Sequence, residues 1–152
     1  MPRPYGLSQW HACVSTHLPP LSAPQRQVLA RWSFGMGLAQ RCGLTTVGVL
    51  LTALFQQRDQ TLFQRLRDWY RNARHPSGAA QGGKRRAVDV TTGFAPVLRW
   101  VLQLLPTDCR TLALARDAAT LGQRFTIRHL SVVIRGSAIP VAWKVVPATA
   151  KG

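Results

Sequence analysis

The 152-residue chain has 20 Lys and Arg residues, five Asp and no Glu, which gives a formal net charge of +15 at pH 7. A hydrophobic content of 46% is typical of a folded protein and argues against disorder along the whole chain. The charge, most of it on Arg, indicates a polyanionic partner. Nucleic acid is favoured over a membrane because guanidinium groups suit bidentate phosphate contacts. The alternative is a basic protein that its charge merely keeps soluble.

The N-terminal sequence has the features of neither a secretory signal nor a membrane anchor. MPRPYGLSQWHACV lacks a continuous apolar stretch, and the longest apolar run, residues 47–55, has the length of a core helix. The three cysteines are odd in number and widely spaced, which favours a reducing cytoplasm over a disulfide framework. We therefore expect a cytoplasmic protein with no membrane partner.

Residues 1–21 contain four prolines and little periodicity, so we predict an irregular arm with at most a short helical turn near residues 7–14. His11, Cys13 and His17 would need a fourth ligand to hold zinc, and none stands at a recognisable spacing. We interpret them as ordinary surface or core residues.

A helix of about four turns is predicted next, because Ser22-x-x-Gln25 matches a capping box and an apolar pattern follows it. Gly43 is expected to end this helix. Gly35 and Gly37 would weaken it in isolation, which indicates that another backbone packs closely there.

A second helix, capped by Thr45 or Thr46, leads through a short turn into a third helix over residues 59–74. The third helix has one apolar stripe and, opposite it, a stripe of Gln and Arg. Such a helix pair is typical of a helix-turn-helix unit, although a solvated helix in any Arg-rich protein would look similar. We predict that the polar side contacts DNA through Gln64, Arg65, Arg67, Arg71 and Arg74.

Residues 76–90 have the composition of a flexible linker, and we place a domain boundary there. The linker includes three consecutive basic residues, Lys84, Arg85 and Arg86. We predict that they clamp a phosphate backbone, the alternative being a solvated linker with ordinary charges. A fourth helix is predicted over residues 92–106.

Residues 112–146 are predicted to form three antiparallel strands, because runs of Val, Ile and Leu are separated by residues 121–123 and by Gly136-Ser137. A two-residue turn at Gly136-Ser137 would place six large apolar side chains on one face, namely Leu130, Val132, Ile134, Ile139, Val141 and Trp143. That face and the strand edges need a cover or a partner. The predicted fold class is α+β.

These features together resemble the N-terminal portion of bacterial insertion-sequence transposases of the DDE type, which have an RNase H-like catalytic domain. The most specific parts of the resemblance are residues 34–54, the sequence Asp68-Trp69-Tyr70-Arg71 and residues 112–147. The resemblance implies an irregular arm at 1–21, a helical DNA-binding domain at 22–75, a basic linker at 76–90 and a truncated RNase H-like domain at 91–152.

In that family the first of three catalytic carboxylates lies at the end of the first strand, which corresponds to Asp117. The resemblance implies that Asp117 is a catalytic residue and a ligand of Mg²⁺, since paired divalent metals activate the attacking group and stabilise the leaving oxygen. Arg116 and Ala119 replace the aliphatic and hydroxyl residues that family members tend to have beside this position. The other two carboxylates would lie beyond Gly152.

We therefore expect the N-terminal fragment of a transposase, which binds double-stranded DNA for cleavage and strand transfer and is inactive alone. It would associate with the bacterial nucleoid when DNA-bound, and its protein partner would be a second copy or the full-length transposase. The alternative is a non-enzymatic, basic DNA-binding protein that regulates or inhibits transposition.

Overall fold

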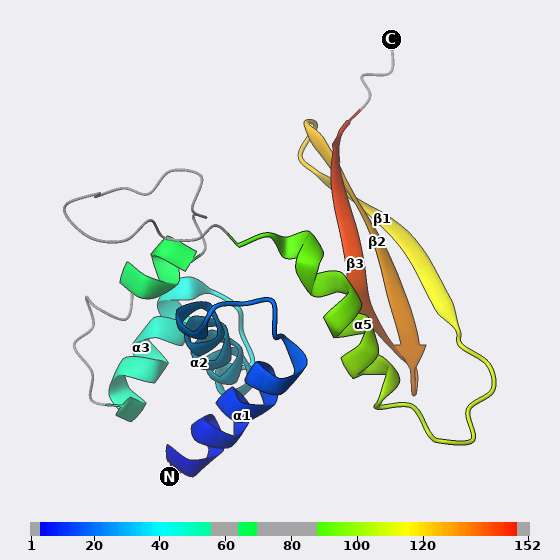
Figure 1. Cartoon of the computed structure of the whole chain (residues 1–152). Coiled ribbons are helices and arrows are strands. Elements are labelled where there is room, and N and C mark those ends of the chain that lie inside the picture. The colour runs from blue at the N-terminus through cyan, green and yellow to red at the C-terminus, as the bar shows by residue number, and fades with distance from the viewer. Residues whose placement is uncertain (1–3, 56–63, 70–87, 149–152) are drawn as a thin grey trace. The chain divides into compact units, whose positions relative to one another are not determined.

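The computed structural model describes residues 4–55, 64–69 and 88–148. They belong to two compact units, Met1–Asp89 and Val90–Gly152. The first unit is helical and the second combines a helix with a three-stranded antiparallel sheet (Figure 1). The α+β class predicted from the sequence is confirmed.

The N-terminal segment is helical, so the prediction of an irregular arm at 1–21 is wrong. Helix α1 runs from Pro4 to His17 and packs on the next helix, where Trp10 Nε1 donates a hydrogen bond of 2.8 Å to Ser33 Oγ. The prolines do not interrupt α1, because Pro4 occupies its first turn and the next proline, Pro19, follows its end.

Helix α2, Ala23–Ala39, begins at the predicted capping residues. The backbone N–H of Ser22 donates to Gln25 Oε1 at 2.8 Å, which satisfies an amide at the start of the helix. The helix ends before the predicted stop at Gly43, because Gln40 takes a left-handed conformation with φ of 52°.

Helix α3, Leu44–Phe55, begins directly after Gly43. The predicted caps Thr45 and Thr46 therefore lie inside its first turn. Among the described residues no single helix is long and apolar enough to cross a membrane, although α2 and α3 pass that test when taken together across a bend of 96°.

The core of the first unit joins α3 to a further helical segment, residues 64–69. Val47 and Leu51 of α3 are buried together with Leu66, and apolar residues of α2 such as Trp32 and Met36 pack against them. Trp32 also meets Trp69 edge to face, with ring centroids 5.9 Å apart. The segment 64–69 is therefore held by its apolar side.

The second unit begins with a short 3-10 helix, Val90–Gly93, which continues into α5, Phe94–Leu102. The predicted helix over 92–106 is thus shorter at both ends. Three strands follow in the order β1-β2-β3, with bounds Leu114–Leu121, Phe125–Ile134 and Ser137–Pro147. The predicted three-stranded antiparallel meander is confirmed.

The turn between β2 and β3 differs from the prediction by one residue. Ile134 pairs with Ser137, so the turn residues are Arg135 and Gly136, both with positive φ (49° and 80°). Positive φ at both central positions is the signature of a type I′ hairpin, whose twist matches that of the strands. The register then shifts once more between Leu130 and Ser131, where one extra residue of β3 forms a bulge.

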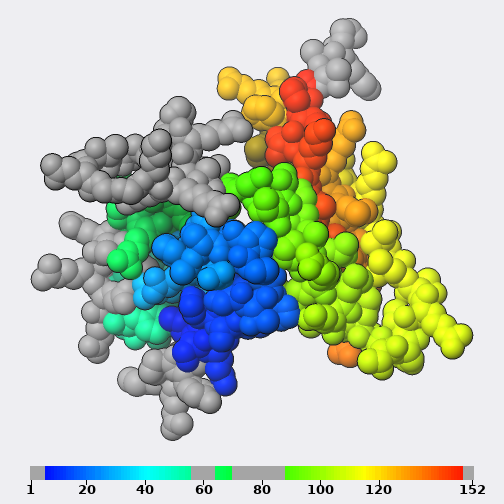
Figure 2. Space-filling model, in the orientation of Figure 1, coloured from blue at the N-terminus to red at the C-terminus, as the bar shows by residue number. Residues whose placement is uncertain are grey.

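Helix α5 covers only part of the predicted apolar face. Val101 packs with Val132 and Val141, with Ile134 and Ile139 beside them. Figure 2 shows the atoms of α5 (green) directly against those of β3 (red). The remaining two residues of the predicted six are more exposed, at 38% for Leu130 and 43% for Trp143. They do not share a face, because Leu130 pairs with Ala142 and Trp143 pairs with His129. The Trp143 ring still meets Phe94 of α5 edge to face, with ring centroids 4.9 Å apart.

A second apolar group lies at the far end of the sheet from the Arg135-Gly136 turn. Cross-strand pairing joins Leu121 to Phe125, Ile127 to Val145 and His129 to Trp143, at alternate positions that share one face. Ile127 is partly buried, whereas the other four large apolar residues among them are exposed: Leu121 60%, Phe125 42%, Trp143 43% and Val145 53%. We call these four residues the open apolar patch.

Candidate nucleic-acid interface

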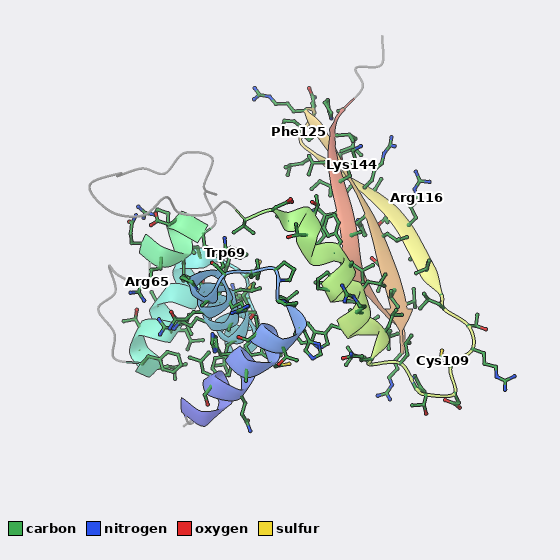
Figure 3. The ribbon with its side chains drawn as sticks, viewed as in Figure 1. Arg65, Trp69, Cys109, Arg116, Phe125 and Lys144 are labelled. Atoms are coloured by element: carbon green, nitrogen blue, oxygen red, sulfur yellow. The ribbon has the colours of Figure 1, made fainter. Side chains whose placement is uncertain are left out.

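The helical segment 64–69 has one buried apolar side and one exposed polar side, as predicted for the third helix. Leu66 is 1% exposed in the core, whereas Gln64, Arg65 and Arg67 are exposed. Figure 3 shows Arg65 projecting outward from this segment. The other predicted DNA-binding residues lie outside the described part of the chain: Arg71, Arg74, Lys84, Arg85 and Arg86.

Gln64 is held against its own helix. Its Nε2 donates to Asp68 Oδ1 at 2.7 Å, one helical turn away. Part of the hydrogen-bonding capacity that sequence reasoning assigned to DNA is therefore used within the helix. The guanidinium groups of Arg65 and Arg67 are better candidates for phosphate contacts.

Arg31 of α2 is a candidate that sequence reasoning missed. It is half-buried, and burial together with the positive charge of Arg65 lowers its pKa from the usual value. Because the charge of Arg65 contributes to this lowering of the pKa, the two guanidinium groups lie close enough for their positive charges to interact. The available sequence signal was the spacing of Gln27 and Arg31, which places two polar side chains four residues apart on one side of α2.

Two hollows meet at Arg31. The smaller, of about 10 Å³, is lined by Gln27, Val28, Arg31, Arg65 and Leu66, and thus joins α2 to the segment 64–69. The larger, of about 260 Å³, is a shallow depression bordered by residues of α1, α2 and α3: Leu7, Ser8, His11, Gln27, Ala30, Arg31 and Phe55. Polar groups able to donate to an anion therefore surround the Arg31 side chain.

Asp117 lies in the middle of β1 rather than at the end of the strand, which corrects the prediction. It is exposed, and its Oδ1 accepts a hydrogen bond of 2.7 Å from the backbone N–H of Ala118. Across the sheet it stands opposite His129. The carboxylate therefore satisfies a backbone amide of its own strand.

The described residues around Asp117 do not by themselves complete a site for the paired magnesium ions that the resemblance implied. Two hard cations need several oxygen ligands, most of them carboxylates. The cross-strand partner of Asp117 is an imidazole, and the preceding residue is the cation Arg116. In the part of the chain that the structure describes, no group of three or more His, Cys, Asp or Glu residues could hold a metal, and His11, Cys13 and His17 form no such group.

The sheet carries a basic row that the sequence analysis did not identify. Arg116 pairs with Leu130, and Arg128, two residues before Leu130, pairs with Lys144. Side chains at alternate positions of paired strands share a face, so Arg116, Arg128 and Lys144 lie on one face across all three strands. All three are exposed. Like charges directly opposite each other repel, and an anion would relieve that repulsion.

No family model, no curated protein and no solved structure matches this chain. What the structure defines is an α+β chain with a helical unit that presents arginines on one side and a sheet unit that presents a basic row.

Proposed function

We propose that the chain binds double-stranded DNA through the exposed side of the helical segment 64–69, as the N-terminal portion of a DDE-type transposase. One observation carries the proposal. Burial of Leu66 against α3 directs Arg65 and Arg67 to the surface in a chain with a net charge of +15. Phosphate contacts by such side chains supply most of the sequence-independent affinity for DNA.

The arrangement of the first unit supports a helix-turn-helix assignment for its DNA-binding part. Helix α3 and the segment 64–69 share the core formed by Val47, Leu51 and Leu66. In such units one helix supports a second, whose outer side meets the DNA. Gln64, Arg65 and Arg67 are the residues of that outer side.

The fold of the second unit supports its assignment as an incomplete RNase H-like domain. Its three antiparallel strands follow one another in the sheet, and α5 covers part of one face. Asp117 would be the first catalytic carboxylate of the complete enzyme, which would use Mg²⁺ to cut and rejoin DNA. The chain by itself would bind DNA without cleaving it, and its partner would be a second copy or the full-length transposase.

The surroundings of the Asp117 carboxylate favour a second, non-enzymatic function. Its Oδ1 accepts a hydrogen bond from the Ala118 amide, and the residue before it in the strand is the cation Arg116. A protein that regulates or inhibits transposition by occupying DNA needs no catalytic carboxylate. The reading frame downstream of Gly152 distinguishes the two functions, because the transposase requires a further Asp and Glu there.

The binding proposal is tested by measuring affinity for a short duplex by fluorescence anisotropy over a range of salt concentrations. Each phosphate contact contributes about −0.9 to the slope of log K against log salt. The variant Arg65→Ala/Arg67→Ala should flatten the slope by up to about two such contacts. The matched control Arg41→Ala/Arg99→Ala removes the same charge from exposed positions on other elements. Equal slopes for both variants would exclude the segment 64–69 as the contact surface.

A further inference from the structure

A positively charged recess joins two helical segments that are distant in the sequence. Arg31 of α2 and Arg65 of the segment 64–69 line the same small hollow, together with Gln27, Val28 and Leu66. The surface of this hollow is mostly apolar, as expected where arginine stems lie along apolar side chains and leave their guanidinium groups toward solvent.

The positive charges of Arg31 and Arg65 repel each other at this recess. Burial and the field of Arg65 both lower the pKa of Arg31, so the charged form of Arg31 is less stable in the folded protein than in water, although Arg31 remains a cation. An anion between the two groups would reverse the sign of their interaction, since each would then face a negative charge. Guanidinium groups bind phosphate oxygens in pairs, and the Gln27 amide adds a neutral donor.

The size of the recess indicates how the anion is presented. A volume of about 10 Å³ accommodates about one water molecule, so a phosphate group in contact with both arginines would sit across its mouth and not inside it. A phosphate held on a larger molecule meets that requirement. The adjoining depression of about 260 Å³, which includes Ser8 and His11, leaves room beside the same mouth.

We propose that Arg31 and Arg65 together bind one phosphate group of the DNA backbone, so that α2 contacts the duplex as well as the segment 64–69. This inference rests on the proposed function, because it assigns the phosphate to DNA. The same chemistry would bind a free phosphate, and the experiment separates these two sources.

The first arm measures duplex binding against salt for the wild-type chain, Arg31→Gln, Arg65→Gln and the double variant. If both side chains hold one phosphate, each single change flattens the slope by about 0.9 and the double change flattens it by no more. Arg41→Gln, at an exposed position away from the recess, is the control. An unchanged slope for Arg31→Gln, with wild-type binding intact, would overturn the inference and leave the proposed function standing.

The second arm measures thermal unfolding with added inorganic phosphate against chloride at equal ionic strength. The wild-type melting temperature should rise with phosphate, and the rise should be lost in Arg31→Gln and Arg65→Gln. If Arg31→Gln fails to fold, Arg31→Lys replaces it, because it keeps the charge and removes the planar fork. Phosphate stabilisation without any duplex binding would overturn both the proposed function and the assignment to DNA, and would leave a site for free phosphate.

Discussion

Gly35 of α2 lies against Val47 of α3 so closely that a Cβ atom at Gly35 would come within 2.7 Å of Val47 Cγ1. The same Cβ would lie 3.0 Å from Leu51 Cγ. The absence of a side chain at Gly35 is therefore what allows α3 to place its buried residues against α2.

Gly35→Ala should destabilise the first unit by about 1–3 kcal/mol, the usual cost of overpacking a core. Gly37→Ala is the matched control, because nothing lies within 4 Å of a Cβ there. It should stabilise the same helix by about 0.5–1 kcal/mol through helix propensity alone. Urea unfolding of both variants measures the two changes in the free energy of unfolding. Changes of the same sign would contradict the close packing of Gly35 against α3.

Arg65→Gln should raise the free energy of unfolding by a few tenths to about 1 kcal/mol at low salt, because it removes the repulsion of Arg31. A base with a lowered folded pKa costs stability at every pH below that pKa, so this gain should not change between pH 5 and pH 9. The gain should disappear at about 1 M salt, where charges are screened. Unfolding at two salt concentrations tests this, and a loss of stability would show that Arg65 has another structural role.

Arg135→Asn should stabilise the second unit by about 0.5–1 kcal/mol. Arg135 has φ of 49°, and a left-handed conformation costs an ordinary side chain roughly 1–2 kcal/mol, whereas Asn tolerates it. Gly136→Ala, at φ of 80°, should destabilise. Thermal unfolding of the two variants should therefore give shifts of opposite direction.

The chain should not nick supercoiled plasmid in the presence of Mg²⁺ or Mn²⁺. Cleavage by paired metals requires charge stabilisation on both the attacking and the leaving oxygen, and the described neighbours of Asp117 offer no set of ligands for two cations. Asp117→Ala should behave as the wild type does. Nicking that this substitution abolishes would show that the site is completed in another way.

The open apolar patch should bind a hydrophobic dye and promote self-association, because exposed apolar groups on a sheet favour a partner. Phe125→Ser should reduce dye fluorescence and shift sedimentation toward the monomer. Leu104→Ser is the control, since Leu104 is 55% exposed but lies outside the sheet. An equal reduction in both variants would contradict a specific role for the patch.

Local patterns in the sequence were enough to predict several features of the fold. Ser22 and Gln25 cap α2 through a contact between near neighbours, and a 3.6-residue period separates Leu66 from Arg65 and Arg67. Val, Ile and Leu runs divided by short turns predicted three antiparallel strands. Each of these features depends on residues close together in the chain, which is why the sequence alone determined them.

Packing between distant residues decided the rest. The register of the turn between β2 and β3 depended on which residue beside Gly136 took positive φ. Helix α1 formed because its apolar side, with Trp10 and Val14, could pack within the first unit. Arg31 and Arg65 line one hollow because Leu66 packs into a core that α2 and α3 also form, with Gly35 close against Val47. No local period records such contacts, since they arise from the shapes of side chains that tertiary folding brings together.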